Sequence, residues 1–342
     1  MTIAAWRDGF VRVLRAPAII AGMFALTIVI ALPLAVAVRG TIAAHLGRSL
    51  MADAAADGAN FDWWEEFGSQ ASGLTTTFSP AIIGFAATLD NLSSILDAQP
   101  EIMPITLALA GYLLAWSFVS AGIFDRYARQ RPTRAFGFFG ASAVFFGRFL
   151  RLAIMAGLVH WALFSRVHTW LLDDGYRWLT RDTAVERNAF LWRVALYVVF
   201  GACLIAVNIV FDYARIRLVV EDRRSVFGAL RAAITFLGRH PAAAFRLYSL
   251  NALAFVVLIV VWSLAAPGVT GAGGVMWVAF IAAQFYVLAR IVLKLQFIAS
   301  QTALFQASLA HARYTAAPAP RWPESPAAET IAAVSSAPLR QL

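Results

Sequence analysis

Residues 17–38 read PAIIAGMFALTIVIALPLAVAV, a run of 22 residues without a charged side chain. About 20 consecutive apolar residues in a helix match the roughly 30 Å hydrocarbon core of a bilayer. Three arginines precede the run and Arg39 follows it. Ala35 and Ala37 form an A-x-A pattern, but the run is longer than the apolar core of a signal peptide. We therefore interpret it as an uncleaved membrane span.

Five further apolar runs of spanning length follow in the chain. Backbone amides in hydrocarbon must be hydrogen-bonded within the segment, and no barrel-like alternation is visible, so each run is expected to be helical. The whole chain is 61% hydrophobic and 14% charged, with mean hydropathy +0.70. The sequence predicts an all-α integral membrane protein with about six transmembrane helices, at 17–38, 103–124, 149–170, 191–211, 247–266 and 275–297.

The spans define the expected domain organisation. We expect a single membrane domain over residues 1–314, with an extracytoplasmic loop at 39–102. Residues 315–342 contain several prolines and many alanines without an apolar period, which predicts a disordered cytoplasmic tail.

The distribution of Lys and Arg predicts the orientation. The N-terminus, the second and fourth loops and the C-terminal side together carry 21 of these residues, against 7 on the other face. Cytoplasmic segments carry the excess of positive charge, so both termini are expected in the cytoplasm. All basic residues except Lys294 are arginine, a bias typical of a GC-rich bacterial genome. We therefore expect the bacterial inner membrane.

Charge and cysteine content exclude several classes of function. The formal charge of +9 is explained by membrane topology, and we expect no nucleic-acid partner. Cys203 is the only cysteine and lies in an apolar run, which rules out a disulfide framework or a thiolate metal cluster. No nucleophile-elbow, zinc-protease or phosphate-loop motif is present. The sequence thus predicts no catalytic residue, no metal site and no cofactor.

The long first loop is rich in Asp and Glu. Within it, Ser79-Pro80 is a typical helix start, with an N-cap serine and a proline at the first helical position. Apolar residues follow at helical spacing, namely Ile82, Phe85, Leu89, Leu92 and Leu96. The pattern predicts an amphipathic helix on the outer membrane surface.

The loops after spans 2 and 4 repeat one sequence pattern. The spans end in Phe-Asp-Arg-Tyr-Ala-Arg at 124–129 and in Phe-Asp-Tyr-Ala-Arg at 211–215. The pattern F-G-x-x-x-A-x-x-x-F-x-G-R then occurs at 136–148 and, 91 positions later, at 227–239. Such self-similarity indicates a duplication. A fainter third copy opens the chain, because Arg-Ala-Pro at 15–17 is similar to Arg-His-Pro at 239–241.

Three copies predict three helical hairpins, each preceded by a cytoplasmic amphipathic helix at the interface. In the helix over 227–239, the expected apolar stripe contains Phe227, Leu230, Ile234 and Leu237, with Arg224 and Arg231 elsewhere.

With these duplicated loops, residues 5–310 resemble a broad set of bacterial six-span inner-membrane proteins. The set includes YciC-like proteins and the membrane domain attached to some glycerophosphodiester phosphodiesterases. The resemblance implies no catalytic residue, because the hydrolase of the fused proteins is a separate soluble domain without a counterpart in this chain.

Two aspartates lie where spans 2 and 4 are expected to meet the cytoplasm. Asp125 precedes Arg129 by four residues and Asp212 precedes Arg215 by three, spacings that permit ion pairs on one helix face. We expect partly solvated interfacial pairs that fix where each span stops. A gating or coupling pair is the alternative.

Other polar residues suggest contacts with lipids or between helices. Contacts with anionic headgroups are predicted for Arg223, Arg224, Arg231, Arg290 and Lys294, because the inner leaflet attracts cationic clusters and long side chains can extend to the interface. The polar groups deepest in the spans are Asn208, Asn251 and Gln284. We interpret these three as helix-to-helix hydrogen bonds.

The leading hypothesis is a non-enzymatic envelope or lipid-associated scaffold, whose partners are membrane lipids and a protein partner or a second copy of the chain. A permease for a small or lipid-like solute is the runner-up, and a polar cavity at Asn208, Asn251 and Gln284 would favour it. A membrane enzyme at the outer face is the third hypothesis. Convergence of Glu65, Glu66 and His160 would favour that one.

Overall fold

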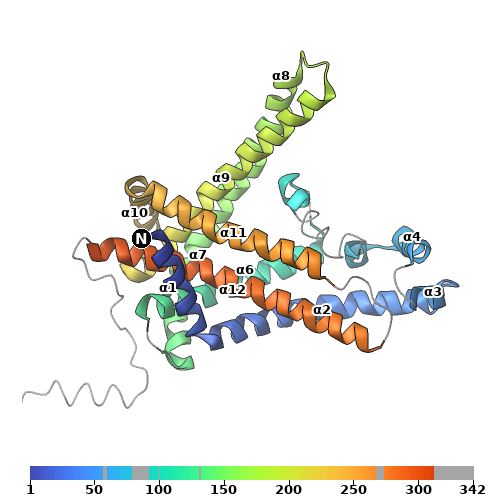
Figure 1. The fold of residues 1–342 in the computed structure, drawn as a ribbon, viewed down its shortest axis with the longest axis horizontal. Helices are drawn as coiled ribbons and strands as arrows, with labels where there is room; N and C mark the ends of the chain where they lie inside the picture. The colour runs from blue at the N-terminus through green and yellow to red at the C-terminus, as the bar shows by residue number, and fades with distance from the viewer. Residues whose placement is uncertain (57–59, 79–91, 100, 131, 267–272, 312–342) are drawn as a thin grey trace, which may run out of the picture. The chain divides into compact units, whose positions relative to one another are not determined.

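The computed structural model describes residues 1–342 except 57–59, 79–91, 100, 131, 267–272 and 312–342. The protein is an all-α multi-pass membrane protein, and the described residues contain no strand. Six of its helical segments are long and apolar enough to cross a bilayer. They are built from α2 (Pro17–Leu46), α6 (Met103–Arg129), α7 (Ala135–Ala162), α9 (Glu186–Val220), α11 (Pro241–Ala265) and α12 (Gly274–His311) (Figure 1).

Shorter helices join and flank these spans. Helix α1 precedes the first span, and α10 precedes the fifth. The shorter elements are α1 (Thr2–Leu14), α3 (Ala52–Ala56), α4 (Phe61–Gln70), η1 (Gly73–Thr77), η3 (Leu163–His168), η4 (Trp170–Gly175), α8 (Tyr176–Thr180) and α10 (Val226–Arg239).

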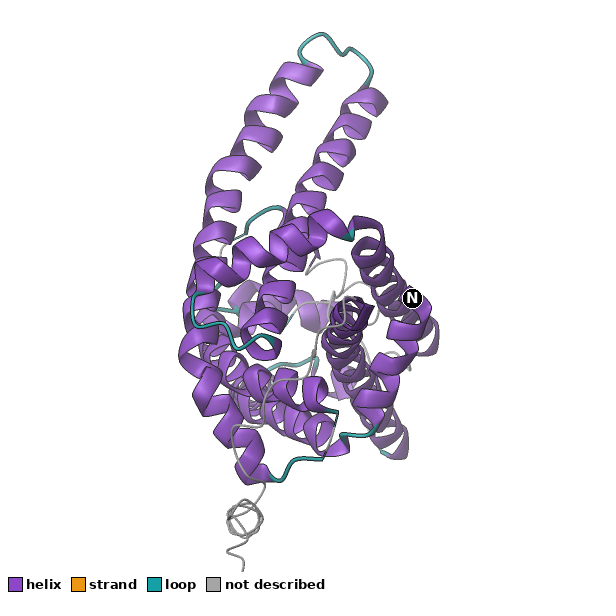
Figure 2. Cartoon of the chain, turned by 90° about the vertical axis from the view of Figure 1, so that its left-hand side faces the viewer, coloured by secondary structure: helices purple, strands orange, loops and turns teal. Residues whose placement is uncertain are grey.

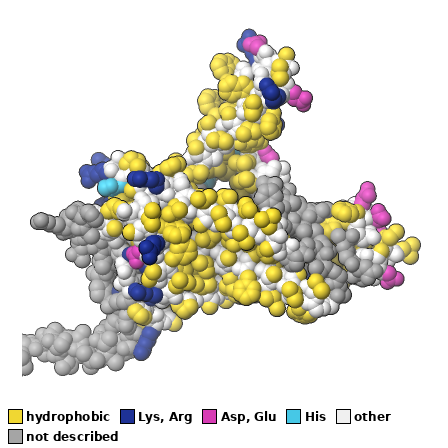
Figure 3. Space-filling model, in the orientation of Figure 1, with side chains coloured by type: hydrophobic (Ala, Val, Ile, Leu, Met, Phe, Trp, Pro, Cys, Tyr) yellow, Lys and Arg dark blue, Asp and Glu magenta, His cyan; other side chains and the backbone are white. Residues whose placement is uncertain are grey.

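The spans expose apolar side chains in the way a lipid-facing helix must. Only 6% of the most apolar window of α2 is buried within the protein, and 11% of that of α11. Figure 3 shows mostly hydrophobic side chains over the face of α11. In water such surfaces would be unfavourable, whereas in hydrocarbon they match the solvent. A transmembrane position also agrees with Pro33 in the interior of α2, since proline is more frequent in transmembrane helices than in soluble ones.

The chain divides into two compact units rather than the single domain expected over 1–314. Unit 1 contains residues 1–16, 113–248 and 296–342, and unit 2 contains residues 17–112 and 249–295. Helices α6, α11 and α12 each contribute to both units. The division follows the packing: the unit 1 parts of α6 and α12 are buried among other helices, whereas most of the unit 2 parts expose apolar side chains.

The C-terminal part of α12 forms the centre of unit 1. Among residues 296–306, all but Phe297 are buried. A helix that is buried on every side belongs to the interior of a fold. We expected span 6 to end at residue 297, so the buried continuation of this helix is a correction to the predicted boundaries.

The two sequence repeats do not form matching elements. Residues 227–239 lie in α10, a separate helix that ends before Pro241, whereas residues 136–148 are the first half of α7 and continue directly into the span. The expectation of a separate surface helix at 136–148 is therefore wrong. Pro241 lacks the backbone N–H that would continue α10, whereas no proline interrupts residues 135–162.

The side chains within the two copies are nevertheless placed alike. Phe145 and Phe236, which correspond in the repeat, are both buried, and Phe136 and Phe227 are both exposed. Helix α1 resembles α10 in position, because it ends just before Pro17 as α10 ends before Pro241.

Helices α7 and α9 lie side by side as a long hairpin in unit 1 (Figure 2). The predicted span at 149–170 is longer in the structure: after α7, π-helical turns at η3 and η4 lead into α8, so that the helix runs from 135 to 180. Trp161, Trp170, Trp178 and Trp192 are exposed along the hairpin.

The first loop folds against the end of α2 in unit 2. Trp63 and Phe67 on α4 are buried, and their rings stack with centroids 5.4 Å apart. Asn60 caps α4 by accepting a hydrogen bond from the backbone N–H of Trp63 at 2.8 Å. Most of the predicted amphipathic helix, from Ser79 to residue 91, lies outside the described residues, as does the predicted disordered tail, whereas residues 92–96 are helical.

Candidate functional site

A group of buried and half-buried polar side chains joins four helices in unit 1. We call it the polar junction and define it as Arg12 of α1, Asp125 and Arg129 of α6, Asp212 of α9, and Gln301 and Gln306 of α12. Such a group requires that most polar atoms be hydrogen-bonded, because burying an unsatisfied polar atom costs about 1–3 kcal/mol. The junction therefore constrains how these four helices can pack.

Arg12 makes the most contacts across the polar junction. Its guanidinium donates to the backbone carbonyl of Tyr127 at 2.9 Å and to Oε1 of Gln306 at 2.7 Å. Asp8, one turn earlier on α1, accepts two further hydrogen bonds at 2.7 and 3.0 Å. Burial lowers the pKa of the Arg12 guanidinium, and the hydrogen bond to Asp8 opposes this shift. Arginine remains protonated in proteins, so the side chain acts as a permanent buried cation.

Gln306 and Gln301 extend the polar junction to α6 and α9. The amide of Gln306 donates to the backbone carbonyl of Ala128 at 2.8 Å. The amide of Gln301 lies 3.4 Å from Oδ2 of Asp212, whose Oδ1 accepts a hydrogen bond from Arg215 at 2.8 Å. The N-terminal segment, both duplicated span ends and the C-terminal part of α12 thus meet in one place.

The two predicted aspartate–arginine pairs both form, but they differ in burial. Asp212 and Arg215 retain side-chain exposures of 24% and 26%. The carboxylate of Asp125 lies 2.8 Å from Nε of Arg129, with exposures of only 3% and 6%. The expectation of a partly solvated pair is therefore wrong for Asp125 and Arg129. The physical reason is the position of α12, because its buried C-terminal part covers the end of α6, where Gln306 contacts the carbonyl of Ala128.

Helices α1 and α10 each have one side that is buried in unit 1 and another side that is exposed. Val226, Ala229, Ala233 and Phe236 form the buried face of α10. Within the predicted apolar stripe, Phe227 and Ile234 are 74% and 58% exposed, whereas Leu230 and Leu237 are half-buried. The exposed residues of α1 include Ile3, Arg7 and Leu14, and Arg15, which follows the helix, is also exposed. Both helices thus combine exposed apolar and arginine side chains.

The five predicted lipid contacts have different surroundings. Arg224 and Arg231 are exposed beside the outward face of α10, where Figure 3 shows Lys and Arg side chains gathered. Arg223 pairs with Glu221. In unit 2, Arg290 is exposed with its guanidinium 5.7 Å from the centroid of Tyr286, and Lys294 lies 4.9 Å from that of Tyr112, whose hydroxyl it also contacts.

The three predicted polar residues of the spans do not share an environment. Asn208 is exposed in unit 1, whereas in unit 2 Asn251 is buried and Gln284 is half-buried. Neither of the cavities in unit 2 described below is lined by them. These two cavities therefore do not favour a permease.

The acidic first loop brings Glu66 to partners at the C-terminal end of α2 and just beyond it, which the sequence did not reveal. Ser49 donates to Oε2 of Glu66 at 2.7 Å, and Nε2 of His45 lies 3.9 Å from Oε1. A serine nucleophile would need the histidine as its hydrogen-bonded base, but here the carboxylate lies between them. Glu65 is exposed, and His160 contacts the backbone carbonyl of Ala156. In the described residues, no group of three or more His, Cys, Asp and Glu could hold a metal ion.

Some signals for the missed residues were present in the sequence. No charge occurs between Lys294 and residue 311, which marks the continuation of α12. Ala5, Gly9, Arg12 and Ala16 lie at helical spacing. Arg12 therefore shares a helix face with three small residues, which is a signal that this face packs against another helix. The charge distribution alone explains that arginine by membrane topology.

Comparisons of this chain with protein-family models, with curated proteins and with solved structures find no match.

Proposed function

We propose that this protein is a non-enzymatic scaffold of the bacterial inner membrane, with both termini in the cytoplasm, that binds the anionic headgroups of the inner leaflet. The observation that carries the proposal is the pair α1 and α10. Each is a short helix with outward apolar and arginine side chains, and each ends two or three positions before the proline that opens a span. Such helices are typical of the headgroup layer.

The packing of α1 and α10 supports one common depth for both helices. A Cβ atom at Gly9 would lie 2.8 Å from Cβ of Ser300, so α1 contacts α12 there. Phe236 of α10 packs against Phe305 of α12, with ring centroids 5.1 Å apart. Ser300 and Phe305, the residues of α12 in these contacts, both lie C-terminal to Lys294, near the end of the sixth span. The two faces can therefore meet the same leaflet.

The polar junction supports a scaffold role in preference to transport. Its residues are hydrogen-bonded to one another and to backbone carbonyls of α6, an arrangement that fixes helices in place. The likeness to YciC-like six-span proteins is part of the same proposal.

The test measures the lipids that surround the full-length protein in membrane discs formed with a copolymer, without detergent. Each Lys or Arg near an anionic surface contributes about 1 kcal/mol. We expect Arg7→Gln, Arg15→Gln, Arg224→Gln and Arg231→Gln combined to abolish the enrichment of phosphatidylglycerol over the bulk membrane. The matched control neutralises four exposed arginines of the α7–α9 hairpin, Arg166, Arg177, Arg181 and Arg187, and should keep the enrichment. Equal loss in both variants would contradict the proposal.

A further inference from the structure

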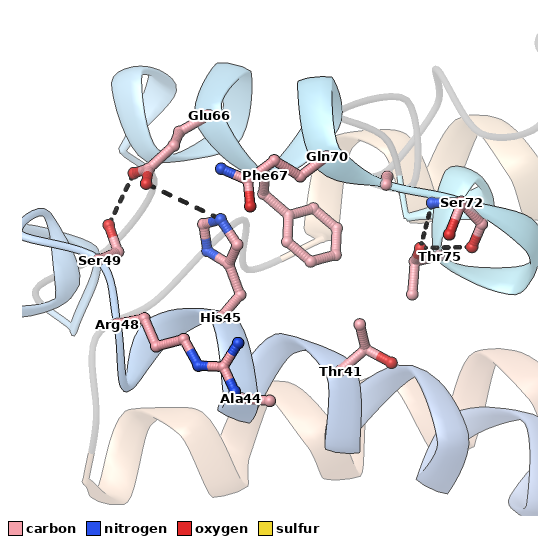
Figure 4. A pocket seen from close by; sticks show the side chains of 11 residues that line it. Thr41, Ala44, His45, Arg48, Ser49, Glu66, Phe67, Gln70, Ser72 and Thr75 are labelled. Atoms are coloured by element: carbon pink, nitrogen blue, oxygen red, sulfur yellow. Dashed lines mark hydrogen bonds and ion pairs between the residues drawn. The ribbon is translucent and has the colours of Figure 1, made fainter.

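A polar cavity of about 410 Å³ opens in unit 2 between the end of α2, helix α4 and η1 (Figure 4). From α2 it is lined by Thr41 and His45, from the turn that follows α2 by Arg48 and Ser49, and from α4 by Glu66 and Gln70. Its size is that of a small-molecule site. The site involves none of the residues to which the proposed function is assigned.

The cavity holds one carboxylate and one guanidinium on separate segments of the chain. Figure 4 shows Glu66 on α4 and Arg48 just after the end of α2, on opposite sides of the cavity. Glu66 is held by the hydroxyl of Ser49 at 2.7 Å. The indole N–H of Trp63 donates to Nδ1 of His45 at 3.2 Å, which fixes the ring beside Glu66. A ligand that carries both a cation and an anion matches this distribution of charge.

An apolar groove of about 440 Å³ adjoins the polar cavity on the preceding turns of α2. Its lining includes Leu34, Val38, Ile42, Leu74, Phe78 and Ile105, together with Arg39. Residues 72–78, which include η1, line both hollows, since Ser72 and Thr75 face the polar cavity whereas Leu74 and Phe78 face the groove. A single amphiphile can therefore occupy both.

The length of α2 places the groove and the cavity at successive membrane depths. Its 30 residues extend about 45 Å, against roughly 30 Å for the hydrocarbon core. The uncharged run ends at Val38, so the groove at residues 34–42 reaches the edge of the hydrocarbon. The cavity at residues 41–49 then lies in the headgroup layer of the leaflet farther from the N-terminus.

We propose that this site binds a phospholipid with an amine headgroup, of the phosphatidylethanolamine class. One acyl chain lies in the apolar groove, the phosphate meets the guanidinium groups of Arg39 and Arg48, and the ammonium group meets Glu66. The carboxylate disfavours phosphatidylglycerol, which has no cation to offer it. In the orientation proposed above, the lipid belongs to the outer leaflet.

The test is lipid binding to the delipidated full-length protein in detergent, measured by native mass spectrometry. We expect one phosphatidylethanolamine to bind at least fivefold more tightly than phosphatidylglycerol. Ala35→Phe fills the groove and should weaken the binding of both lipids tenfold or more. The matched control Ala37→Phe adds the same ring to the same helix but lines neither hollow, and should bind as the parent does.

The headgroup is tested separately from the chain. Glu66→Gln should abolish the preference for phosphatidylethanolamine, whereas Glu65→Gln, at an exposed position outside the lining, should keep it. If Glu66→Gln does not fold, Arg39→Gln should weaken both lipids through the phosphate. Equal affinity of the parent for both lipids, or unchanged binding by Ala35→Phe, would overturn the proposal. So would binding of soluble phosphoethanolamine as tight as that of the lipid, because the groove would then contribute nothing.

Discussion

The burial of Asp125 changes what its ion pair does. With the side chains of Asp125 and Arg129 only 3% and 6% exposed, neither charge has the solvent that would replace a lost partner. Removing one member of a buried pair costs about 3–5 kcal/mol, because the remaining charge is stranded in a low-dielectric site. An exposed pair contributes only about 0–1 kcal/mol. If this pair opened during gating, the two buried charges would have to separate, at a large cost in free energy. A fixed structural role has no such cost.

Asp125→Asn should therefore destabilise the folded protein by about 3–5 kcal/mol, and Asp125→Asn with Arg129→Gln should recover part of that loss. Thermal unfolding of the detergent-purified protein measures both. The control is Asp174→Asn, because its pair with Arg177 has exposures of 64% and 75% and little should change there. A parent-like midpoint for Asp125→Asn would show that the pair is solvated after all.

Close packing between elements is best seen where α1 crosses α12. A Cβ atom at Gly9 would lie 2.8 Å from both the Cβ and the backbone N of Ser300, and 2.9 Å from Oε1 of Gln296. The amide of Gln296 in turn donates to the backbone carbonyl of Trp6 at 2.7 Å. The two backbones approach so closely that only glycine fits, which also holds Arg12 against Gln306.

Gly9→Ala should destabilise unit 1 by about 1–3 kcal/mol, because a methyl group forced into a packed contact shifts its neighbours. Gly22→Ala is the matched control: it too lies in a helix, but its Cβ would meet nothing within 4 Å, so the better helix propensity of alanine should leave stability equal or slightly higher. Chemical denaturation of both variants measures the difference. Equal effects at the two positions would argue against the close approach of α1 to α12.

The sequence pattern predicts the lipid-facing helices well and predicts the helix segments that pack inside the protein poorly. The span that begins at Pro17 was predicted because hydrocarbon selects long apolar runs. The buried end of α12 was not, because Gln296, Gln301 and Gln306 look like the residues of an interfacial segment. Neutral amides are tolerated in the interior only when specific partners are supplied, and those partners lie on helices distant in sequence. The same holds for His45, Ser49 and Glu66.

At the scale of the whole molecule, the distribution of basic residues and the polar junction place the same four segments of the chain together. Arg12, Ala128, Asp212 and Gln306 come from four segments that the charge census assigns to one side of the membrane, and hydrogen bonds link Arg12, Gln306 and Ala128. The contact between Gln301 and Asp212 adds the fourth segment. The grouping constrains which segments share a side, and the excess of arginine predicts which side that is.

Single cysteines at Ser69 and Arg224, each in a Cys203→Ser background, should label from opposite sides of the membrane. Ser69 and Arg224 are exposed in the structure, so access to a polar maleimide reports the side alone. In intact cells the cysteine at position 69 should react and that at position 224 should react only after lysis. Reaction of position 224 in intact cells would invert the proposed orientation.

The central position of residues 296–306 has a consequence for biosynthesis. Helix α1 leaves the ribosome before α12, so Arg12 is made 294 residues ahead of Gln306, its hydrogen-bond partner. During that interval the ends of α1, α6 and α9 expose small and polar surfaces that α12 later covers. A nascent chain halted before residue 296 would carry nearly all of the six apolar runs yet lack the helix around which unit 1 packs. Unit 1 can close only after the C-terminal part of α12 has been made.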